Sequence, residues 1–412
     1  MKSSRRNFTL SVLALAVGSQ AGAAPRLASE LVRTPGLDVT RNSNAWLEID
    51  ASAFEQNLQK VRDRLNERTR ICVVMKADAY GHGISLLMPS VIRMKIPCVG
   101  VTSNEEARLV RQSGFKGQLV RLRAAPLGEM VNGMRYGVEE LLGNLDVARQ
   151  LAEQARRRHL TVAFHLALNS GEMARNGLEV DDEKVKQQTL EILAMPGLRP
   201  VGIMTHFAMG EADQVRAGIA EFDRDAHWLI EQAGLDRKRI TLHAANSFLT
   251  LDIPEAHFDM VRPGRILYGF STKGDFKKAM RFMTRVASVN EYPSGSGVSY
   301  SHTFVLKRDS RLANIPAGYS DGYRRAFGNK GYVLINGHRA PIVGSITMNT
   351  FMVDVTDFPD VKANDEVVLF GRQGDQEITQ LELQTVIKDI MVDMSVPWGA
   401  TNPKVLASRA AR

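Results

Sequence analysis

Apolar, strand-like runs alternate with amphipathic segments between residues 71 and 261, and this alternation constrains the fold more than any other feature. Strands joined by helical crossovers pair in parallel, and the number of runs favours a closed barrel over an open sheet. We therefore predict an α/β protein in which residues 51–282 form a (β/α)8 barrel of the TIM type, with its helices outside. The expected strands are Ile71–Met75, Cys98–Val101, Gln118–Leu122, Val138–Leu142, Val162–Leu168, Val201–Thr205, Ile240–His243 and Phe258–Val261. The expected helices include Ser52–Leu65 with Ser52 as N-cap, Ser103–Gln112, Leu145–Arg158, Asp182–Leu193 and Ala212–Gly234.

The pattern changes after about Met283, where the runs become short, rich in β-branched residues and separated by Gly, Pro, Asn and Asp. This predicts a C-terminal all-β domain over residues 283–412. Residues 24–50 are expected to form an arm and a strand, Trp46–Ile49, that joins this second domain. The other expected strands are Val286–Val289, Thr303–Lys307, Arg311–Ile315, Gly331–Ile335, Arg339–Val343, Met352–Val355 and Glu366–Leu369.

The first 23 residues have the pattern of a signal peptide. A basic start is followed by the apolar run Leu10–Val17 and by small residues that suit cleavage after Ala23. The segment Ser4–Phe8 also resembles a twin-arginine signal, so the general secretory and twin-arginine routes both remain open. We therefore expect a periplasmic protein that is not bound to a membrane after cleavage, since no further apolar run reaches membrane length.

The net charge of +8 falls to +5 once the three basic residues of the signal are removed. The remaining positive charge is scattered along the chain, without basic runs or interleaved aromatic residues, so no nucleic-acid partner is expected. The positive charge is compatible with anionic small molecules as ligands at least as well as with nucleic acid. No metal site is expected.

The chain has two cysteines, Cys72 and Cys98, near the starts of two expected neighbouring strands. Side by side in a parallel sheet, their sulfurs would lie at similar height, and an oxidising compartment would favour a disulfide between them. Two buried free thiols are the alternative. With the signal peptide in view, the disulfide is the favoured expectation.

A lysine, Lys76, stands where the first barrel strand ends, in the segment Lys76–Gly83. Chemistry in parallel α/β folds takes place at the C-terminal ends of strands. A lysine with apolar surroundings loses its proton readily and can attack a carbonyl as a free amine. A structural lysine that caps the strand is the alternative for this residue taken alone.

Other strand ends also carry polar side chains. Arg175 lies in a glycine-containing loop after the fifth expected strand, and His206 ends the sixth. Barrels commonly bind phosphate after strands seven and eight, where Ser247 opens a short helix. We therefore expect Ser247 and the amides of Gly264 and Arg265 to form a phosphate-binding cup.

In this order the motifs resemble those of the alanine racemases, which are pyridoxal 5'-phosphate (PLP) enzymes. The resemblance implies that Lys76 bonds the cofactor covalently and that Tyr80 is a phosphate ligand. It places Arg175 beside the phenolic oxygen of PLP and the substrate carboxylate. His206 is expected against the cofactor ring, and Arg262 at the pyridine nitrogen. Because an arginine keeps its proton, the ring is a weaker electron sink and side reactions are limited.

The resemblance extends into the β domain. Tyr300, in Gly297–Thr303, matches the second catalytic base of the racemases, which comes from the partner subunit. One acid/base on each face of a planar carbanion is what racemisation requires, with Lys76 acting on the D-isomer and Tyr300 on the L-isomer. A homodimer with shared active sites is therefore implied. Tyr319 matches the entrance residue, and Met348 and Asn349 the segment that holds the substrate carboxylate.

The chain departs from ordinary alanine racemases at two places. Ala167 stands where those enzymes carry a carbamylated lysine, so that an anion, or Arg121 and Arg123, would replace the missing brace. Asn402 aligns with the tyrosine that narrows the alanine pocket.

Together with the signal peptide and the cysteine pair, these departures resemble the exported broad-specificity amino-acid racemases, which act on free amino acids such as Lys, Arg, Ala and Met. An exported alanine racemase of narrow specificity is the alternative, whereas a related decarboxylase would need a catalytic cysteine in the β domain. The specificity positions are Arg121, Arg123, Ala167, Asn169, Gly171, Arg175 and Asn176.

Overall fold

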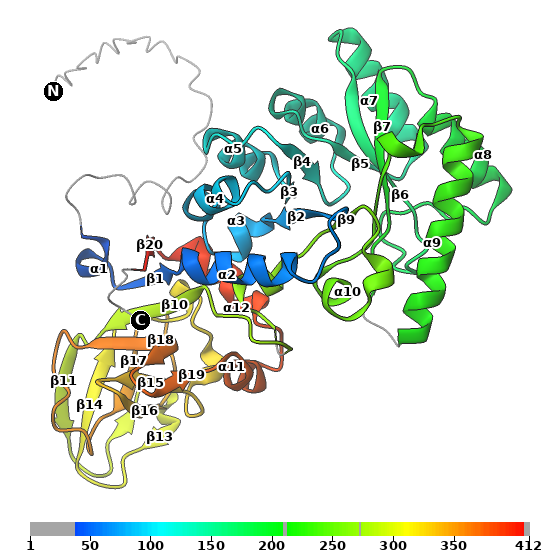
Figure 1. Ribbon diagram of the computed structural model, residues 1–412. Coiled ribbons are helices and arrows are strands. Elements are labelled where there is room, and N and C mark those ends of the chain that lie inside the picture. Colours follow the sequence, from blue (N-terminus) through cyan, green and yellow to red (C-terminus); the bar gives the residue numbers. More distant parts are fainter. Residues whose placement is uncertain (1–37, 209–211, 272, 408–412) are drawn as a thin grey trace, which may run out of the picture.

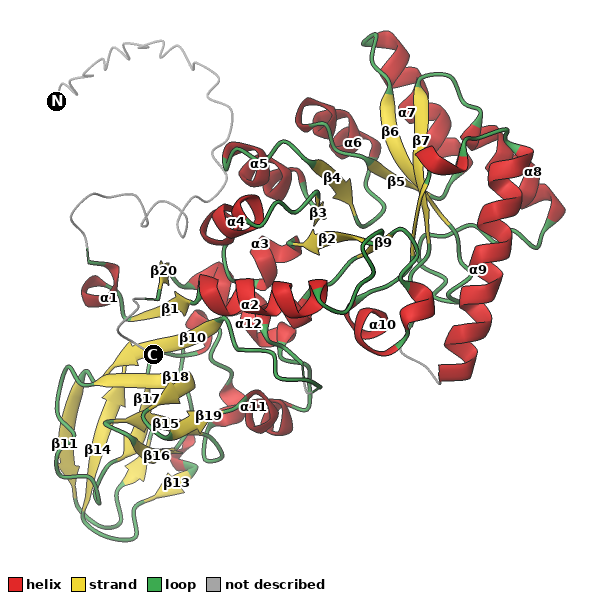
Figure 2. Cartoon of the chain, viewed as in Figure 1, coloured by secondary structure: helices red, strands yellow, loops and turns green. Residues whose placement is uncertain are grey.

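The computed structural model describes residues 38–208, 212–271 and 273–407, arranged as a barrel and a β-rich domain (Figures 1 and 2). The expected signal peptide, residues 1–23, lies outside the described residues. Among the described helices, none combines the length and apolarity needed to cross a membrane.

The barrel is built from two four-stranded parallel sheets, ordered β4-β3-β2-β9 and β5-β6-β7-β8. A parallel bridge between Val120 and Glu139 joins them on one side. On the other side, the amide of Asp259 donates to the carbonyl of Leu242 at 3.1 Å. The predicted eight-stranded barrel is therefore confirmed. Its strands are β2 (Arg70–Val74), β3 (Cys98–Val101), β4 (Gln118–Arg121), β5 (Glu140–Leu142), β6 (Val162–Ala167), β7 (Leu198–Met204), β8 (Thr241–His243) and β9 (Met260–Val261).

Helices cover the outside of the barrel (Figure 2). The first of them begins one residue earlier than expected, because Asp50 rather than Ser52 is its N-cap: the Asp50 carboxylate accepts the amides of Ser52 and Ala53. The barrel helices are α2 (Ala51–Arg62), α4 (Ile84–Arg93), α5 (Asn104–Gln112), α6 (Leu127–Gly133), α7 (Leu145–Arg157), α8 (Glu183–Leu193), α9 (Ala212–Gln232) and α10 (Ser247–Asp252).

The second domain is organised by one large sheet of order β11-β14-β17-β16-β15-β18-β10-β1-β20. The strand β1 (Ala45–Ile49) pairs antiparallel with β10, which begins at Met280, and parallel with β20. A separate hairpin joins β12 (Gly297–Val298) to β13 (Phe304–Val305). The other strands are β10 (Met280–Arg285), β11 (Ser288–Tyr292), β14 (Ser310–Ile315), β15 (Tyr332–Ile335), β16 (His338–Val343), β17 (Phe351–Asp354), β18 (Glu366–Gln373), β19 (Gln376–Ile378) and β20 (Lys404–Leu406).

This domain is β-rich rather than all-β, because it contains the helices α11 (Gln380–Ile387) and α12 (Val392–Thr401). The helix α12 contains Pro397, so the local helix propensity of this segment does not predict a helix. Packing stabilises it instead: the ring of Trp398 lies 5.0 Å from that of Phe282 and 5.6 Å from that of Phe370.

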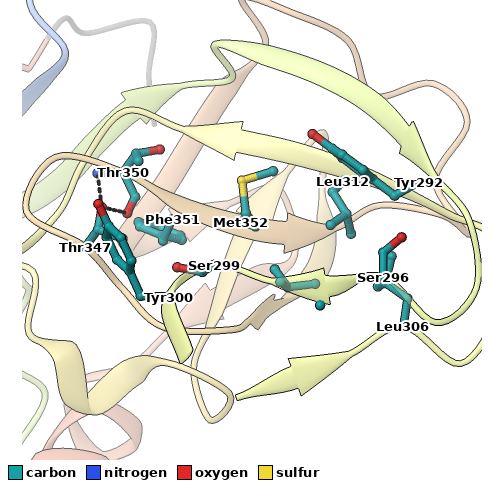
Figure 3. A pocket seen from close by; sticks show the side chains of 12 residues that line it. Tyr292, Ser296, Ser299, Tyr300, Leu306, Leu312, Thr347, Thr350, Phe351 and Met352 are labelled. Atoms are coloured by element: carbon teal, nitrogen blue, oxygen red, sulfur yellow. Dashed lines mark hydrogen bonds between the residues drawn. The ribbon is translucent and has the colours of Figure 1, made fainter. Parts of the chain in front are cut away.

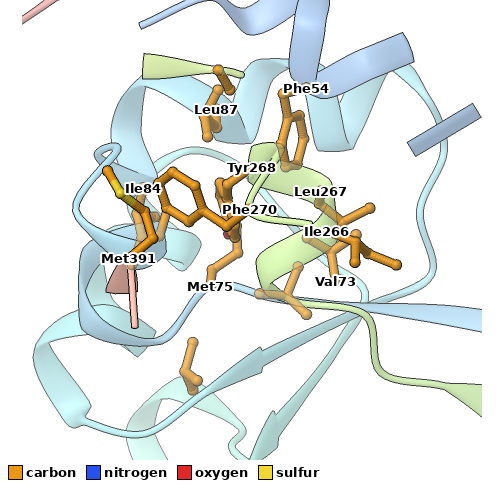
Figure 4. Packing of buried hydrophobic residues seen from close by; sticks show 14 of the residues in the cluster. Phe54, Val73, Met75, Ile84, Leu87, Ile266, Leu267, Tyr268, Phe270 and Met391 are labelled. Carbon is orange, nitrogen blue, oxygen red and sulfur yellow. The ribbon is translucent and has the colours of Figure 1, made fainter. Parts of the chain in front are cut away.

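An aromatic cluster that includes Phe54, Tyr268 and Phe270 packs against the end of β2 (Figure 4). The buried ring of Tyr268 packs 5.6 Å from Phe54 and 4.9 Å from Tyr80, and its hydroxyl donates to the carbonyl of Val74 at 2.8 Å. The cluster therefore fixes the end of β2, from which Lys76 projects.

Candidate active site

The residues after Lys76 form a left-handed turn, α3 (Lys76–Tyr80). Ala77, Asp78, Ala79 and Tyr80 have φ values of 53°, 51°, 57° and 55°. Such a conformation costs an L-residue roughly 1–2 kcal/mol each, so the surroundings must hold it.

The carboxylate of Glu106 is one of the groups that hold this turn. It accepts the amide of Ala77 at 2.7 Å and that of Thr102 at 2.7 Å. Glu106 also belongs to the capping box that begins α5 with Ser103. This role of Glu106 was not predicted from the sequence, although the Ser-x-x-Glu spacing of a capping box is visible there.

Helix α12 packs closely against the other side of the turn. A Cβ on Gly81 would overlap the carbonyl of Ser395, and one on Gly399 would overlap the backbone of Gly81. The hydroxyl of Ser395 donates to the carbonyl of Tyr80 at 3.1 Å. The lysine turn is thus held between the barrel and the last helix of the second domain.

The amine of Lys76 opens to solvent at the mouth of the barrel, yet its surroundings favour the neutral form. Partial burial and the positive charge of Arg175 lower the pKa of Lys76, and Glu106 opposes them weakly. A lysine in this position is a nucleophile for an aldehyde.

A cup suited to a phosphate lies beside it. The hydroxyl of Ser247 accepts the amide of Gly264 at 2.9 Å, and the hydroxyl of Tyr80 lies directly against Gly264. Burial raises the pKa of Tyr80 well above its usual value, only partly offset by Arg265, so the phenol keeps a proton to donate. The hydroxyls of Ser247 and Tyr80 thus meet at the backbone of Gly264, and hydroxyl donors gathered in this way fit the phosphate of PLP.

Gly264→Ala is expected to weaken PLP binding about 10–100-fold, because the added methyl group displaces the Tyr80 hydroxyl from the cup. The dissociation constant is measured by titrating the apoenzyme with PLP. Gly128→Ala is the matched control, since its Cβ would meet open space. Equal affinity in the Gly264 variant would show that the phosphate binds elsewhere.

Arg262 lies at the centre of the barrel mouth and is only 4% exposed. It donates to the carbonyls of Thr205 at 2.9 Å and Ala244 at 3.1 Å, and it lies 3.4 Å from the Nδ1 of His206. Burial lowers the pKa of Arg262 to about 10, which leaves it charged at neutral pH. Burial and the charge of Arg262 lower the pKa of His206 to about 3, so this ring is neutral. A fixed cation beside a neutral ring fits the pyridine edge of PLP.

A hydrogen-bonded chain, which we call the Arg262–Glu139 chain, runs from this point through the barrel. Arg262 donates to Nδ1 of His243 at 2.8 Å, and Nε2 of His243 lies 2.8 Å from Nδ1 of His165. Nε2 of His165 lies 2.9 Å from a carboxylate oxygen of Glu139. Because an arginine can only donate, each imidazole accepts at Nδ1 and donates at Nε2. This hydrogen-bonded chain was not predicted from the sequence, where its signal is the presence of two histidines, His165 and His243, in otherwise apolar strands.

The loop after β6 positions Arg175. The Asn169 side chain accepts the amide of Ala174 at 2.9 Å, and Nε of Arg175 donates to Asn176 at 3.0 Å. A Cβ on Gly171 would overlap the carbonyl of His206, so this residue lets the loop approach β7. Asn169, Gly171 and Asn176 therefore shape the loop.

Two of the expected specificity residues, Arg121 and Arg123, belong to an ion-pair network. Fully buried Arg121 bonds Glu140 at 2.6 Å and Glu129 at 2.9 Å, and Arg123 bonds Glu129 at 2.8 Å. Arg121 also donates to Asn104 and to the carbonyl of Thr102, so its donors are used within the chain. Arg121 therefore braces β4 against β5 and is not a free ligand for an anion. Ala167 lies in a small apolar cluster with Leu141 and Met204.

The residues expected to complete the site from the second domain form a surface of their own. Tyr300 is 75% exposed and lines an apolar groove of about 490 Å³, with Thr347 and Phe351 (Figure 3). All residues that line this groove belong to the second domain. Among the described residues, no hydrogen bond connects Tyr300 with the barrel. Within one chain, the groove that Tyr300 lines therefore includes neither Lys76 nor another described residue of the barrel.

Tyr319, Met348 and Asn349 gather around Ser320. The hydroxyl of Ser320 donates to the carbonyl of Met348 at 2.8 Å and accepts from Asn349 at 2.9 Å. Tyr319 is 44% and Met348 53% exposed. Buried Asn402 donates to the carbonyl of Asp321 at 2.9 Å, so its amide holds this turn.

The two cysteines are exact register partners on β2 and β3, and the structure contains them as buried free thiols. Burial and the contact with Cys72 raise the pKa of the Cys98 thiol well above its usual value. The expected disulfide is thus not formed here, although the positions allow it.

Comparison with known proteins identifies the family. The N-terminal domain of alanine racemases matches residues 49–272, and the C-terminal domain matches residues 279–406. A broad specificity amino-acid racemase of Pseudomonas taetrolens is 52% identical over 97% of this chain and 99% of its own. Among solved structures, alanine racemase of Clostridium difficile 630 superposes with a TM-score of 0.82 at 26% identity, covering 89% of this chain and 97% of that one. Alanine racemase of Bartonella henselae with covalently bound pyridoxal phosphate gives 0.76 at 25% identity, covering 89% of this chain and 100% of that one. With the lysine turn, the phosphate cup and the buried arginine in one barrel, the chain belongs to the alanine racemase family.

Proposed function

We propose that this protein is a PLP-dependent racemase of free amino acids with broad side-chain tolerance. The observation that carries the proposal is the barrel mouth, where a lysine of lowered pKa stands beside a phosphate cup and a buried arginine. The Pseudomonas taetrolens relative supports the breadth of specificity.

The cofactor would be held by Lys76 through a covalent bond, by Ser247, Gly264 and Tyr80 at the phosphate, and by Arg262 at the ring nitrogen. PLP bound there supplies an electron sink for the substrate α-carbon. Arg175 holds the substrate carboxylate, so that the Cα–H bond points at a base. The Lys76 amine moves the proton at one face of that carbon, and the phenol of Tyr300 does so at the other.

A homodimer completes the site in this proposal. The groove around Tyr300 is apolar and exposed in one chain, as expected of a surface that a second copy covers. In a two-fold dimer each subunit gives its Tyr300 to the partner's Lys76 and receives one in return.

The experiment for specificity is chiral chromatography of the holoenzyme after separate incubation with L-alanine, L-lysine, L-arginine and L-methionine. We expect D-isomers from all four, because Asn402 stands where ordinary alanine racemases carry the tyrosine that narrows the pocket. Conversion of alanine alone would instead establish the narrow alternative. No conversion of any substrate would refute the racemase proposal.

We also propose that the enzyme acts in the periplasm, where Cys72 and Cys98 would form a disulfide. Adjacent register positions bring their Cα atoms within the range that a disulfide spans. Titration of the protein isolated from the periplasm, unfolded without reductant, should find no free thiol. The same titration after reduction should find two, and two thiols before reduction would refute the disulfide.

A further inference from the structure

A polar cavity of about 590 Å³ lies at the N-terminal ends of the barrel strands, on the face opposite the cofactor site. Six of its twelve lining residues are arginine or lysine, and two are carboxylates. In barrels of this type the N-terminal face usually contributes to stability alone. A concave surface with such an excess of positive charge attracts anions more strongly than a flat one.

The floor of the cavity is preorganised. Arg70 donates to the side-chain carbonyl of Gln118 at 2.8 Å and to the hydroxyl of Thr241 at 2.6 Å. At the edge, Arg237 is held by Asp259 at 3.0 Å and by the carbonyl of Ile240 at 2.9 Å. Guanidinium groups that are already held in place lose little freedom when an anion binds.

The remaining cations of the cavity are available to a ligand. They are exposed, and within the part of the chain that the structure describes none of them forms an ion pair, although the charge of Arg199 reaches Glu139, where against burial and together with His165 it lowers the pKa of that carboxyl. A cluster of unpaired like charges is unfavourable by itself, and a multivalent anion relieves it by binding several of them together. These residues are Arg68, Arg199, Lys238 and Arg239.

The cavity also contains one end of the Arg262–Glu139 chain, since Glu139 lines it. An anion bound there disfavours the ionised carboxylate of Glu139 and weakens the hydrogen bond that orients His165. His243 and then Arg262 follow His165 in the chain, so the effect reaches the group expected at the pyridine nitrogen.

We propose that the N-terminal cavity binds a small multivalent anion, carrying phosphates or several carboxylates, and that the Arg262–Glu139 chain couples this site to the cofactor. The coupling rests on the proposed function, because it requires PLP beside Arg262. Binding of the anion to the N-terminal cavity does not depend on the proposed function.

Calorimetric titration of the holoenzyme tests the site, with pyrophosphate and citrate as probes of the two chemistries. We expect saturable binding of at least one probe, weakened about 10-fold in Arg199→Gln/Lys238→Gln. Lys116→Gln/Lys184→Gln removes the same charge from exposed positions outside the cavity and should leave the affinity unchanged. No saturable heat with either probe, or an equal loss in both double variants, would overturn the site.

The coupling is tested by the absorbance of bound PLP during the same titration. We expect a spectral change that saturates together with the heat. Glu139→Gln, which keeps a carbonyl acceptor for His165, should bind the probe without this change. Heat without a spectral change in the unaltered enzyme would overturn the coupling. Neither signal requires turnover, so failure here is distinct from failure of the racemase proposal.

Discussion

Replacing Lys76 with alanine is expected to abolish racemisation of every substrate, with a loss of about 10³-fold or more, and to remove the visible absorbance of lysine-bonded PLP. Among the described residues, the Lys76 amine lies at the barrel mouth with a lowered pKa, so it can bond the cofactor aldehyde, and it is also a catalytic base in the proposed function. The fold should persist, because the side chain projects into solvent and the turn behind it is held by Glu106 and α12.

The matched control is Lys116→Ala, which removes an exposed lysine from the loop before β4. This variant should keep both the absorbance and the activity. Retained absorbance in Lys76→Ala would instead show that another amine bonds the cofactor, and the assignment of the lysine turn would be wrong.

Tyr300→Phe is expected to slow proton removal from L-amino acids by about 10²–10⁴-fold while removal from D-amino acids persists. The substitution deletes one hydroxyl from a side chain that is 75% exposed, so packing is little changed. Exchange of the α-proton in deuterated water, followed by NMR for each enantiomer separately, measures the rate of proton removal at each face of the substrate α-carbon independently. Tyr292→Phe, in the same groove, should leave both exchange rates unaltered.

Co-expression of the two variants tests whether Tyr300 acts on the partner. A mixed dimer of Lys76→Ala and Tyr300→Phe subunits has one site with both defects and one with none, so random mixing should restore about a quarter of the sites. Equal loss of exchange from both enantiomers in Tyr300→Phe would contradict the two-base scheme. A lack of restoration would contradict the shared site.

The sequence predicted the barrel because runs such as Ile71–Met75 are apolar on both faces, which local pattern reveals. It did not predict the left-handed turn: none of the residues 77–80 is glycine, and the turn depends on Glu106, which is distant along the chain. The same holds for α12, where burial of Trp398 outweighs the unfavourable Pro397. Contacts between residues that are remote in sequence therefore determine the local structure where the propensities of the residues do not.

The expectation that Arg121 replaces the missing brace at a specificity position illustrates a second limit. Arginine near an active site suggests a ligand, yet Glu140 and Glu129 occupy this guanidinium, and neither was visible as its partner in the sequence. Arg175, by contrast, keeps an exposed guanidinium at the mouth, as the loop pattern suggested. Whether an arginine side chain is available to a ligand therefore depends on which carboxylates lie beside it in the folded chain.

The position of β1 between β10 and β20 sets an order of events during biosynthesis. This strand leaves the ribosome before the barrel, but its neighbours are made only after the barrel and at the end of the second domain. The barrel can close while β1 is still an unpaired apolar strand, open to pairing with other chains. The large sheet is completed only after Lys404–Leu406 emerge, and loss of that strand would leave an edge of β1 exposed.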